Sequence, residues 1–448
     1  MSLRSILSRV PPAIGLACLL LWTAPSQAVP SYARQTGQEC AACHVGSFGP
    51  QLTPYGIKFK IGGYTDSDGK DGHVPISGMA VASFTNTNKK LADPPDHGYN
   101  RNNNVSIDEI SLFLAGKLAE NIGSFVQLTY DGTSGDSAID QMDLRLAHAT
   151  SLAGRDLVVG LSLNNNPGVQ DPFNTLSGWG FPYVTTPFGF SGAETGSFAN
   201  GAVEQRVLGL TAYAFYDNSW YAEAGTYRSL PRNLQDKLGL DLAEDPGRLK
   251  TGSAYWRLAY FKDLKTQAYS AGVFGFSGSL QPDRQVSQAN GYNDIGIDAM
   301  YQYLGTREHI VTVQGSYLRE HQKRSASLGS GEASKKFGHL NELKLNTSYT
   351  YQQTWGTSLG YFNTSGDSDS SLYADNTRTR PNTAGGIVEL NWTPSGKEGS
   401  WGAPWANARF GAQYTFYGKY NGSSKNYDGT GRSASDNNTL FLYVWTAF

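Results

Sequence analysis

Two cysteines and a histidine form the sequence Cys40-Ala41-Ala42-Cys43-His44, whose C-x-x-C-H spacing is the attachment signature of c-type haem. In such a site each thiol adds to one vinyl group of the porphyrin, and the histidine binds the iron as an axial ligand. A redox C-x-x-C pair would lie in a βαβ pattern, and a zinc site would need further Cys or clustered His; neither accompanies this motif. We therefore expect one haem c, held covalently by Cys40 and Cys43 and axially by His44.

The iron has a sixth position, for which Met and His are the common ligands. Met79 is the first candidate, because it follows the haem motif closely in the sequence. It is an even number of positions from Ser83 and Thr85, so its side chain is predicted to face the lumen with theirs. His73 and His97 are the rival ligands. A sixth position that is open or holds water is the remaining alternative.

Residues 1–28 are predicted to be a secretory signal peptide that is removed from the mature protein. They carry Arg4 and Arg9, an apolar run over residues 13–22, and the small-residue cleavage site Ser26-Gln27-Ala28. Cys18 lies in the middle of the apolar run, which disfavours a lipid attachment there. Removal of this leader, with its two arginines and no acidic residue, takes the formal net charge from −2 to −4. With no basic stripe, a nucleic-acid partner is excluded.

The composition after the leader favours strands that cross a membrane. No apolar run reaches the ~18 residues of a spanning helix, yet aromatic residues make up 12% of the chain and glycines number 52. A transmembrane β-barrel has this character, because its strands alternate apolar and polar residues. A secreted solenoid or sandwich shares part of it. Residues 440–448, which end on Phe448 with apolar residues at every second position, resemble the C-terminal signal for outer-membrane assembly.

Segments with a period of two recur from about residue 78 to the C-terminus and number about sixteen, with fourteen and eighteen as alternatives. The clearest examples are Val105–Leu118, Ile122–Asp131, Ala202–Tyr216, Trp220–Leu230, Gly338–Gln352 and Pro404–Tyr420. In the first of these, the lipid face is predicted to hold Ile110, Leu112, Leu114 and Leu118, and the lumen face Glu109, Ser111 and Lys117.

Short and long connections alternate along the chain. Short turns are expected at residues 119–121, 217–219, 264–266 and 305–307, and long polar loops at 89–104, 164–201, 231–250, 281–291, 324–336, 366–380 and 421–438. Short periplasmic turns and long outer loops are typical of outer-membrane barrels. The longest loop, 164–201, either folds into the lumen as a constriction or caps the barrel outside.

Several charged residues are candidates for lumen or cofactor contacts. Arg34, Lys58 and Lys60 could pair with haem propionates or remain solvated. Acidic side chains predicted to face the lumen each have a basic neighbour of the same parity: Glu109 with Lys117, Asp143 with Arg145, and Glu342 with Lys344. Mixed charge is usual inside porins, so we assign no iron site to them.

The N-terminal segment resembles a known family. Its residues Tyr32-Ala33-Arg34-Gln35-Thr36-Gly37, the haem motif, Leu52-Thr53-Pro54-Tyr55-Gly56, Phe59-Lys60 and Gly62-Gly63-Tyr64 follow the order found in fused monohaem cytochrome–porins of bacterial outer membranes. An extra residue in Phe48-Gly49-Pro50-Gln51 departs from the family pattern, and the barrel part matches only in its general alternation.

The resemblance implies an all-β transmembrane barrel of about sixteen antiparallel strands with a small N-terminal monohaem cytochrome c segment. Residues 1–28 would be the signal peptide and residues 77–448 the barrel. Residues 29–76 would be the haem segment, which plugs the barrel and lies in its lumen or at its periplasmic side. It also implies iron(II) oxidase activity: electrons from extracellular Fe(II) would pass through the haem to a periplasmic cytochrome or copper protein. Two alternatives remain, a different reduced donor, and a diffusion porin whose plug contains haem.

Overall fold

The computed structural model describes residues 29–448 except residues 71, 204, 238–246, 251, 283–286, 398, 401–404 and 406. The predicted signal peptide, with Arg4, Arg9 and Cys18, lies outside the described residues. Among the described residues, no helix has both the length and the apolar character required to cross a membrane.

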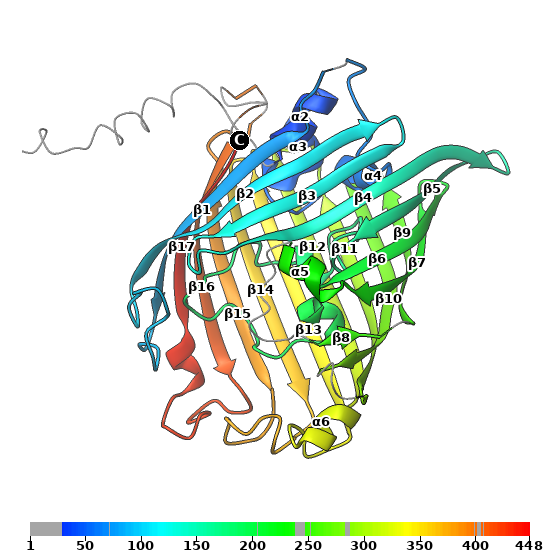
Figure 1. The fold of residues 1–448 in the computed structure, drawn as a ribbon. Helices are drawn as coiled ribbons and strands as arrows, with labels where there is room; N and C mark the ends of the chain where they lie inside the picture. Colours follow the sequence, from blue (N-terminus) through cyan, green and yellow to red (C-terminus); the bar gives the residue numbers. More distant parts are fainter. Residues whose placement is uncertain are drawn as a thin grey trace, which may run out of the picture.

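A closed antiparallel sheet forms the body of the molecule (Figure 1). Its strands are β1 (Ile76–Thr87), β2 (Asn104–Ala119), β3 (Ile122–Asp131), β4 (Ser137–Leu152), β5 (Arg155–Asn164), β6 (Val207–Tyr216), β7 (Trp220–Ser229), β8 (Arg248–Leu249), β9 (Ser253–Asp263), β10 (Gln267–Gln281), β11 (Asn290–Tyr303), β12 (His309–Lys323), β13 (Phe337–Tyr351), β14 (Trp355–Gly366), β15 (Thr383–Trp392), β16 (Asn407–Lys419) and β17 (Thr439–Ala447). The first strand pairs with both β2 and β17, which closes the barrel. The two-residue β8 pairs with β10 beside β9, so the wall has the predicted sixteen strand positions.

The predicted strands agree with the observed ones except at their ends. The segment Ile122–Asp131 is β3 without change. The sixth strand begins at Val207 rather than Ala202, because Phe198–Ala202 form a helical turn, η5, instead. The predicted segment 404–420 shortens to β16, and 338–352 shifts by one residue to become β13.

Side-chain alternation in β2 confirms the predicted faces over most of its length. Ile110, Leu112 and Leu114 are exposed on the outside, whereas Ser111 is buried in the barrel interior. Lys117 keeps the register of Ser111 but lies at the periplasmic end of the strand, where it is exposed, and a bulge follows it.

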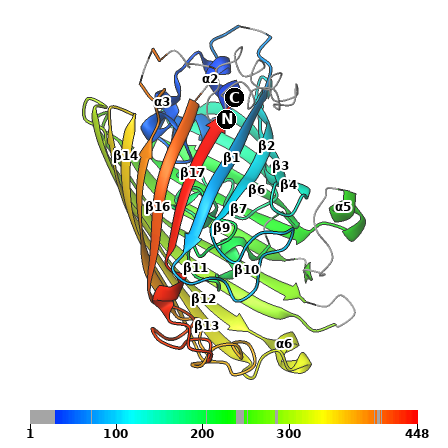
Figure 2. The same cartoon turned by 90° about the vertical axis from the view of Figure 1, so that its left-hand side faces the viewer.

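Most of the short connections lie at one end of the barrel, together with the C-terminus, and most of the long loops lie at the other end (Figures 1 and 2). The exceptions are the short β3–β4 connection at the long-loop end and the longer β15–β16 connection at the short-turn end. The long loops carry the short helices η4 (Ser177–Trp179), α5 (Arg232–Lys237), α6 (Ser325–Ser330) and η6 (Ala434–Asn437). By the usual asymmetry of such barrels, the end with short turns faces the periplasm.

Between residue 29 and the barrel lie four short helical elements: α2 (Pro30–Thr36), α3 (Cys40–Cys43), η3 (Val45–Ser47) and α4 (Pro54–Ile61). Proline at the first position favours the start of α2 and of α4, and the Thr53 hydroxyl accepts a hydrogen bond from Gly56 N at the start of α4. Gly37, with a φ of 65°, ends α2. The four elements lie at the periplasmic end and reach into the lumen (Figure 2).

Candidate functional site

The residues of the haem motif occupy one helical turn and the residue after it. Cys40 and Cys43 begin and end α3, so their three-residue spacing puts both thiols on the same side of the turn. His44 leaves the helix in an extended conformation, and its backbone N–H donates to Cys40 O at 2.8 Å. This arrangement brings two thiols and an imidazole close together, as a covalent haem site requires.

Glycine at position 56 allows α4 to pack closely against the motif. A Cβ atom at Gly56 would overlap the carbonyl oxygen of Cys43, so no other residue fits without movement of the backbone. The Thr53 hydroxyl also donates to Ala42 O, which fastens the start of α4 to the motif. The pattern Leu52-Thr53-Pro54-Tyr55-Gly56 therefore has a direct packing function beside α3.

A cavity of about 280 Å³ lies beside the motif, between the helical segment and the barrel wall. Cys43, His44 and Met79 all line it, while Cys40 is buried behind it. Most of the remaining lining is apolar and aromatic, and includes Phe59, Phe113, Phe125, Trp179, Tyr183 and Trp445. An apolar pocket lined by a few ligating groups is the kind of site that holds a porphyrin.

Electrostatics at the motif favour neutral ligands. Burial lowers the pKa of His44 to about 4, and a backbone interaction with Gly49 offsets part of that effect. The buried Nδ1 atom of His44 makes no hydrogen bond of standard geometry. Burial also raises the pKa of Cys43 to about 12. A buried imidazole that stays neutral has a lone pair for iron, and a buried thiol gains by becoming an uncharged thioether, so these residues fit a haem c.

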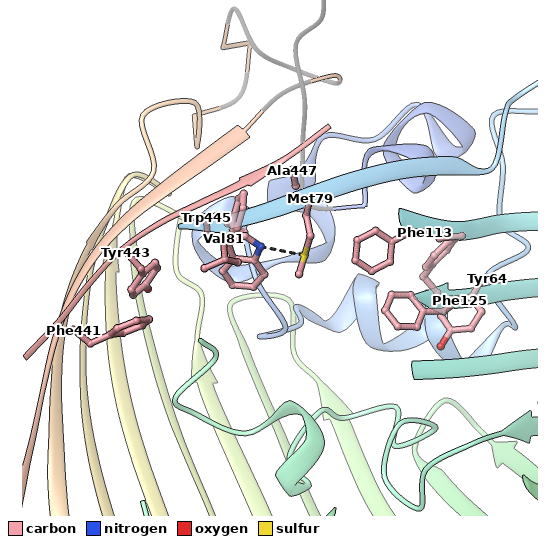
Figure 3. Close-up of a cluster of buried hydrophobic side chains, with 12 residues drawn as sticks. Tyr64, Met79, Val81, Phe113, Phe125, Phe441, Tyr443, Trp445 and Ala447 are labelled. Atoms are coloured by element: carbon pink, nitrogen blue, oxygen red, sulfur yellow. Dashed lines mark hydrogen bonds between the residues drawn. The ribbon is translucent and has the colours of Figure 1, made fainter. Parts of the chain in front are cut away.

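The structure brings Met79 to the cavity and leaves both rival histidines away from it. Met79 is 8% exposed, faces the lumen from β1, and accepts a hydrogen bond at its sulfur from Trp445 Nε1 at 3.3 Å (Figure 3). His73 contacts Asp68 at 2.9 Å on the periplasmic side. His97 lies in the long loop that connects β1 to β2, at the opposite end of the barrel.

Of the three cations expected near the propionates, only Lys60 lines the cavity. Its ammonium group donates to Val169 O at 2.7 Å and to Asn174 Oδ1 at 2.9 Å, and it lies 4.5 Å from the centre of the Trp179 ring. Arg34 instead donates to Ile76 O and lies over Trp405 at the periplasmic surface. Lys58 forms an ion pair with Asp263 at 2.8 Å.

The helical segment is fastened to the barrel wall on all sides. Its hydrogen bonds reach strands that are far apart in the sheet: Tyr32 with β3, Tyr64 with β4, Ile61 with β6, Lys58 with β9, Leu52 with β11, Gln51 with β13, and Gly46 and Ser47 with β16. The segment therefore spans the periplasmic mouth of the barrel from wall to wall.

The long connection between β5 and β6 folds into the lumen, which was one of the two predicted alternatives for this loop; the other was a cap outside the barrel. Val169, Phe173 and Leu176 are buried there. Consecutive backbone N–H groups of Ser197, Phe198 and Ala199 donate to Glu342, Glu320 and Asp294 on three neighbouring strands. This loop meets the helical segment where Asn174 Nδ2 donates to Pro50 O at 2.8 Å. It thus forms the extracellular-facing wall of the cavity.

The acidic residues predicted to face the lumen do so, and each has a structural partner. Asp143 forms an ion pair with Arg145, Glu342 binds the infolded loop, and Glu109 accepts a hydrogen bond from Gln127 at 2.8 Å. Among the described residues, no group of three or more His, Cys, Asp and Glu side chains has the arrangement of a metal site.

The sequence does not predict the aromatic lining of the cavity, which includes Trp179, Tyr183 and Trp445. Trp445 was assigned only to the C-terminal signal, although its parity with Phe441 and Tyr443 would have placed it in the lumen. Trp179 and Tyr183 lie in the infolded loop, where no periodicity indicates which side chains reach the cavity.

The outer face of the barrel is apolar and has an aromatic belt near the periplasmic turns. Leu359, Leu390 and Ile297 are more than half exposed on this face. Aromatic residues on the outside of neighbouring strands contact one another there, in the pairs Trp220–Tyr260, Tyr260–Tyr269, Trp355–Trp392 and Trp392–Phe410. Apolar bands with aromatic girdles belong to barrels that sit in lipid. The protein is a porin-like β-barrel of the bacterial outer membrane.

Comparison with known proteins adds only the outline of the barrel. No family model matches the chain, and no curated protein sequence matches it. Solved structures that resemble it include an anion-selective porin from Comamonas acidovorans (12% identity, 83% of this chain and 98% of that chain, TM-score 0.45). The outer membrane channel DcaP of Acinetobacter baumannii is another (10% identity, 83% and 96%, TM-score 0.42). A third is a loop-deletion mutant of OmpT, an outer membrane protein of Vibrio cholerae (12% identity, 83% and 98%, TM-score 0.42). At these values none of their functions is assigned to this chain.

Proposed function

We propose that this protein carries electrons across the outer membrane through one haem c, bound by Cys40 and Cys43, with His44 and Met79 as axial ligands. The observation that carries the proposal is the convergence of Cys43, His44 and Met79 on one cavity. His44 comes from the helical segment and Met79, 35 positions later, from the barrel wall, so one cavity receives a candidate iron ligand from each of these two parts of the fold.

The haem would supply a single iron that accepts and releases one electron reversibly. The chain's own residues provide the environment: Phe113, Phe125 and Trp179 give the site apolar walls, and Lys60 offers a cation at its wall. A methionine ligand and an apolar surrounding both favour the reduced iron, which suits a site that takes electrons from a weak reductant.

The donor is proposed to be Fe(II) at the extracellular side, as the family resemblance implies. Fe(II) loses one electron and becomes Fe(III), and the electron ends on an oxidised periplasmic cytochrome or copper protein. The location of the cavity supports this direction, because the helical segment that bounds it lies at the periplasmic mouth. An apolar layer of about 25 Å keeps charged iron out, so a carrier held within the barrel removes the need to move the ion.

The proposal is tested with purified full-length protein. Mass spectrometry after denaturation should show the mass of one haem added to the mature chain, and a C40A/C43A variant should lack it. Anaerobic addition of Fe(II) should then reduce the haem spectrum of the native protein. If the haem stays oxidised in excess Fe(II) but is reduced by another metal or by a sulfur compound, that compound and not Fe(II) is the electron donor.

A diffusion porin with a haem-containing plug is the second candidate function. The infolded loop between β5 and β6 favours it, because a loop fastened to the inner wall is a usual way to set the width of a pore. Single-channel recordings in planar bilayers separate the two functions. A steady conductance in the haem-loaded protein supports the porin, whereas a closed barrel supports electron transfer without solute passage.

A further inference from the structure

We infer that Trp445 positions the Met79 sulfur as the sixth ligand of the haem iron, and that pairing of the first and last strands is what completes this coordination. The inference rests on the proposed haem and deepens it. It assigns a positioning residue for one ligand and makes the ligand set depend on the closed barrel.

The two residues face each other diagonally across the closure seam. Met79 is opposite Ala447, and Trp445 is opposite Val81, in the register of β1 with β17. The indole Nε1–H donates to the sulfur at 3.3 Å, and both side chains are buried, at 8% and 9% exposure (Figure 3). A donor aimed at a thioether restricts the directions in which its lone pairs can point. Residues that hold a ligand in this way commonly tune a metal site.

Trp445 also contacts the segment that carries the other axial ligand. The Phe48 ring, four positions after His44, packs edge-on against the indole at a centroid distance of 4.8 Å and an angle of 86°. Phe48 is fully buried, and Arg409 lies 5.3 Å from its ring centre. The indole therefore lies between the helical segment and β1, where it fixes the distance between them.

Residues 29–75 contain no methionine, so a methionine ligand must come from the barrel wall. Met79 lies at the periplasmic end of the seam, next to Gly78, which exchanges two backbone hydrogen bonds with Phe448 at 2.5 and 2.7 Å. Before β17 pairs with β1, the hydrogen bond from the Trp445 indole to the Met79 sulfur is absent. The coordination is therefore expected to report barrel closure.

The experiment uses the full-length haem protein folded in detergent, then unfolded with urea. The absorption band of methionine-ligated ferric haem should be present in the folded barrel and disappear together with the gel mobility of the folded form. Met79→Leu should remove the band, while M142L and M300L, which change the other two methionines of the mature chain, should keep it. Trp445→Phe keeps an aromatic ring but removes the donor, so imidazole should displace the sulfur at about fivefold lower concentration, as loss of one hydrogen bond predicts.

The inference is overturned by a band that persists in Met79→Leu, by a band that survives opening of the barrel, or by unchanged imidazole affinity in Trp445→Phe. If Trp445→Phe does not assemble, Phe48→Leu removes the ring that packs against the indole and loosens the donor instead, and unchanged imidazole affinity there also overturns the inference. Mass spectrometry separates the two proposals. A chain without added haem defeats the proposed function, whereas attached haem without a methionine band defeats only this inference.

Discussion

Asp143 and Arg145, two positions apart on β4, form an ion pair at 2.8 Å in which both side chains are completely buried. Tyr64 of the helical segment donates to the same aspartate at 2.7 Å, and Arg145 donates to Lys60 O at 3.0 Å and to Gln170 O in the infolded loop. One pair on the wall therefore fastens both elements that enclose the cavity.

Removing one charge of this pair should release the helical segment. Asp143→Asn leaves the Arg145 guanidinium buried without its counter-charge, which costs about 3–5 kcal/mol. Limited proteolysis of the folded protein should then cleave between residues 29 and 75, where the native protein resists. The matched control is Arg155→Gln. This residue pairs with Asp217 at 2.7 Å, but both side chains are largely exposed, so its loss should cost under about 1 kcal/mol. Equal effects of the two variants would contradict the structure.

Closeness of α4 to the haem motif gives a second prediction. Gly56→Ala should push α4 away from Cys43 and destabilise the segment by about 1–3 kcal/mol, since overpacking of a tight contact costs this much. The fraction of chains that carry haem, measured by absorbance against total protein, should fall. Gly192→Ala is the control, because a Cβ there meets nothing within 4 Å. Full haem content in Gly56→Ala would show that the close packing is not needed.

Contact of the outer face with lipid gives a third prediction. Leu359→Arg places a charge on the outside of β14, where the leucine is 57% exposed, and should destabilise the barrel by about 2–4 kcal/mol in urea unfolding from lipid vesicles. Leu152→Arg is the control: Leu152 is 58% exposed but lies at the end of β4, by the short turn. A similar free energy of unfolding for the two variants would place residue 359 outside the hydrocarbon layer.

An aspartate hub in the outer loops predicts a dependence on pH. Asp369 is buried, forms an ion pair with Arg324 at 2.9 Å, and accepts hydrogen bonds from Ser334 N and Leu372 N at 2.8 and 3.1 Å. These bonds hold the pKa of Asp369 below its ordinary value. Because the folded pKa lies below the unfolded one, the stabilisation is complete above about pH 4 and is lost as the pH falls below it.

A spin label at Leu372→Cys should therefore become mobile between pH 4 and pH 2 while the barrel stays folded. Asp369→Asn should show that mobility already at pH 7, since charge-assisted hydrogen bonds contribute about 2 kcal/mol. Glu332→Gln, a change at an exposed loop residue, serves as the control and should keep the native behaviour. A label whose mobility is independent of pH would show that ionised Asp369 does not hold this loop.

The barrel was predictable because its signal is repeated along the chain. Ile110 and Ser111 face opposite sides for the same reason as residues in every other strand, so sixteen weak patterns support one another. The bulge after Lys117 was not predictable, since a bulge depends on backbone pairing that composition does not reveal. The closeness of the two thiols and the imidazole in the C-x-x-C-H motif was predictable without knowledge of the fold, because their spacing within one helical turn determines it.

The contacts across the lumen could not be predicted, because they join residues without a shared period. Sequence reasoning treated Arg34, Lys58 and Lys60 alike, yet only Lys60 reaches the cavity, since the direction of α4 decides which side chain points inward. Trp179 and Tyr183 belong to a loop whose path is set by Glu342, Glu320 and Asp294 on the opposite wall. The partnership of Met79 with Trp445 was hidden for a related reason: 366 positions separate the two residues.

The burial of Cys40 has a consequence for the order of maturation. In the closed barrel this thiol is 7% exposed and lies behind a segment bonded to the wall on all sides. If the proposed haem is attached at Cys40, an attachment enzyme could not reach this buried residue in the closed barrel, so the thioether bonds would have to form while the chain is still an unassembled periplasmic intermediate. The outer-membrane assembly machinery would then receive a chain that already carries haem. A delay in haem supply would therefore lead to accumulation of precursor that is not inserted in the membrane.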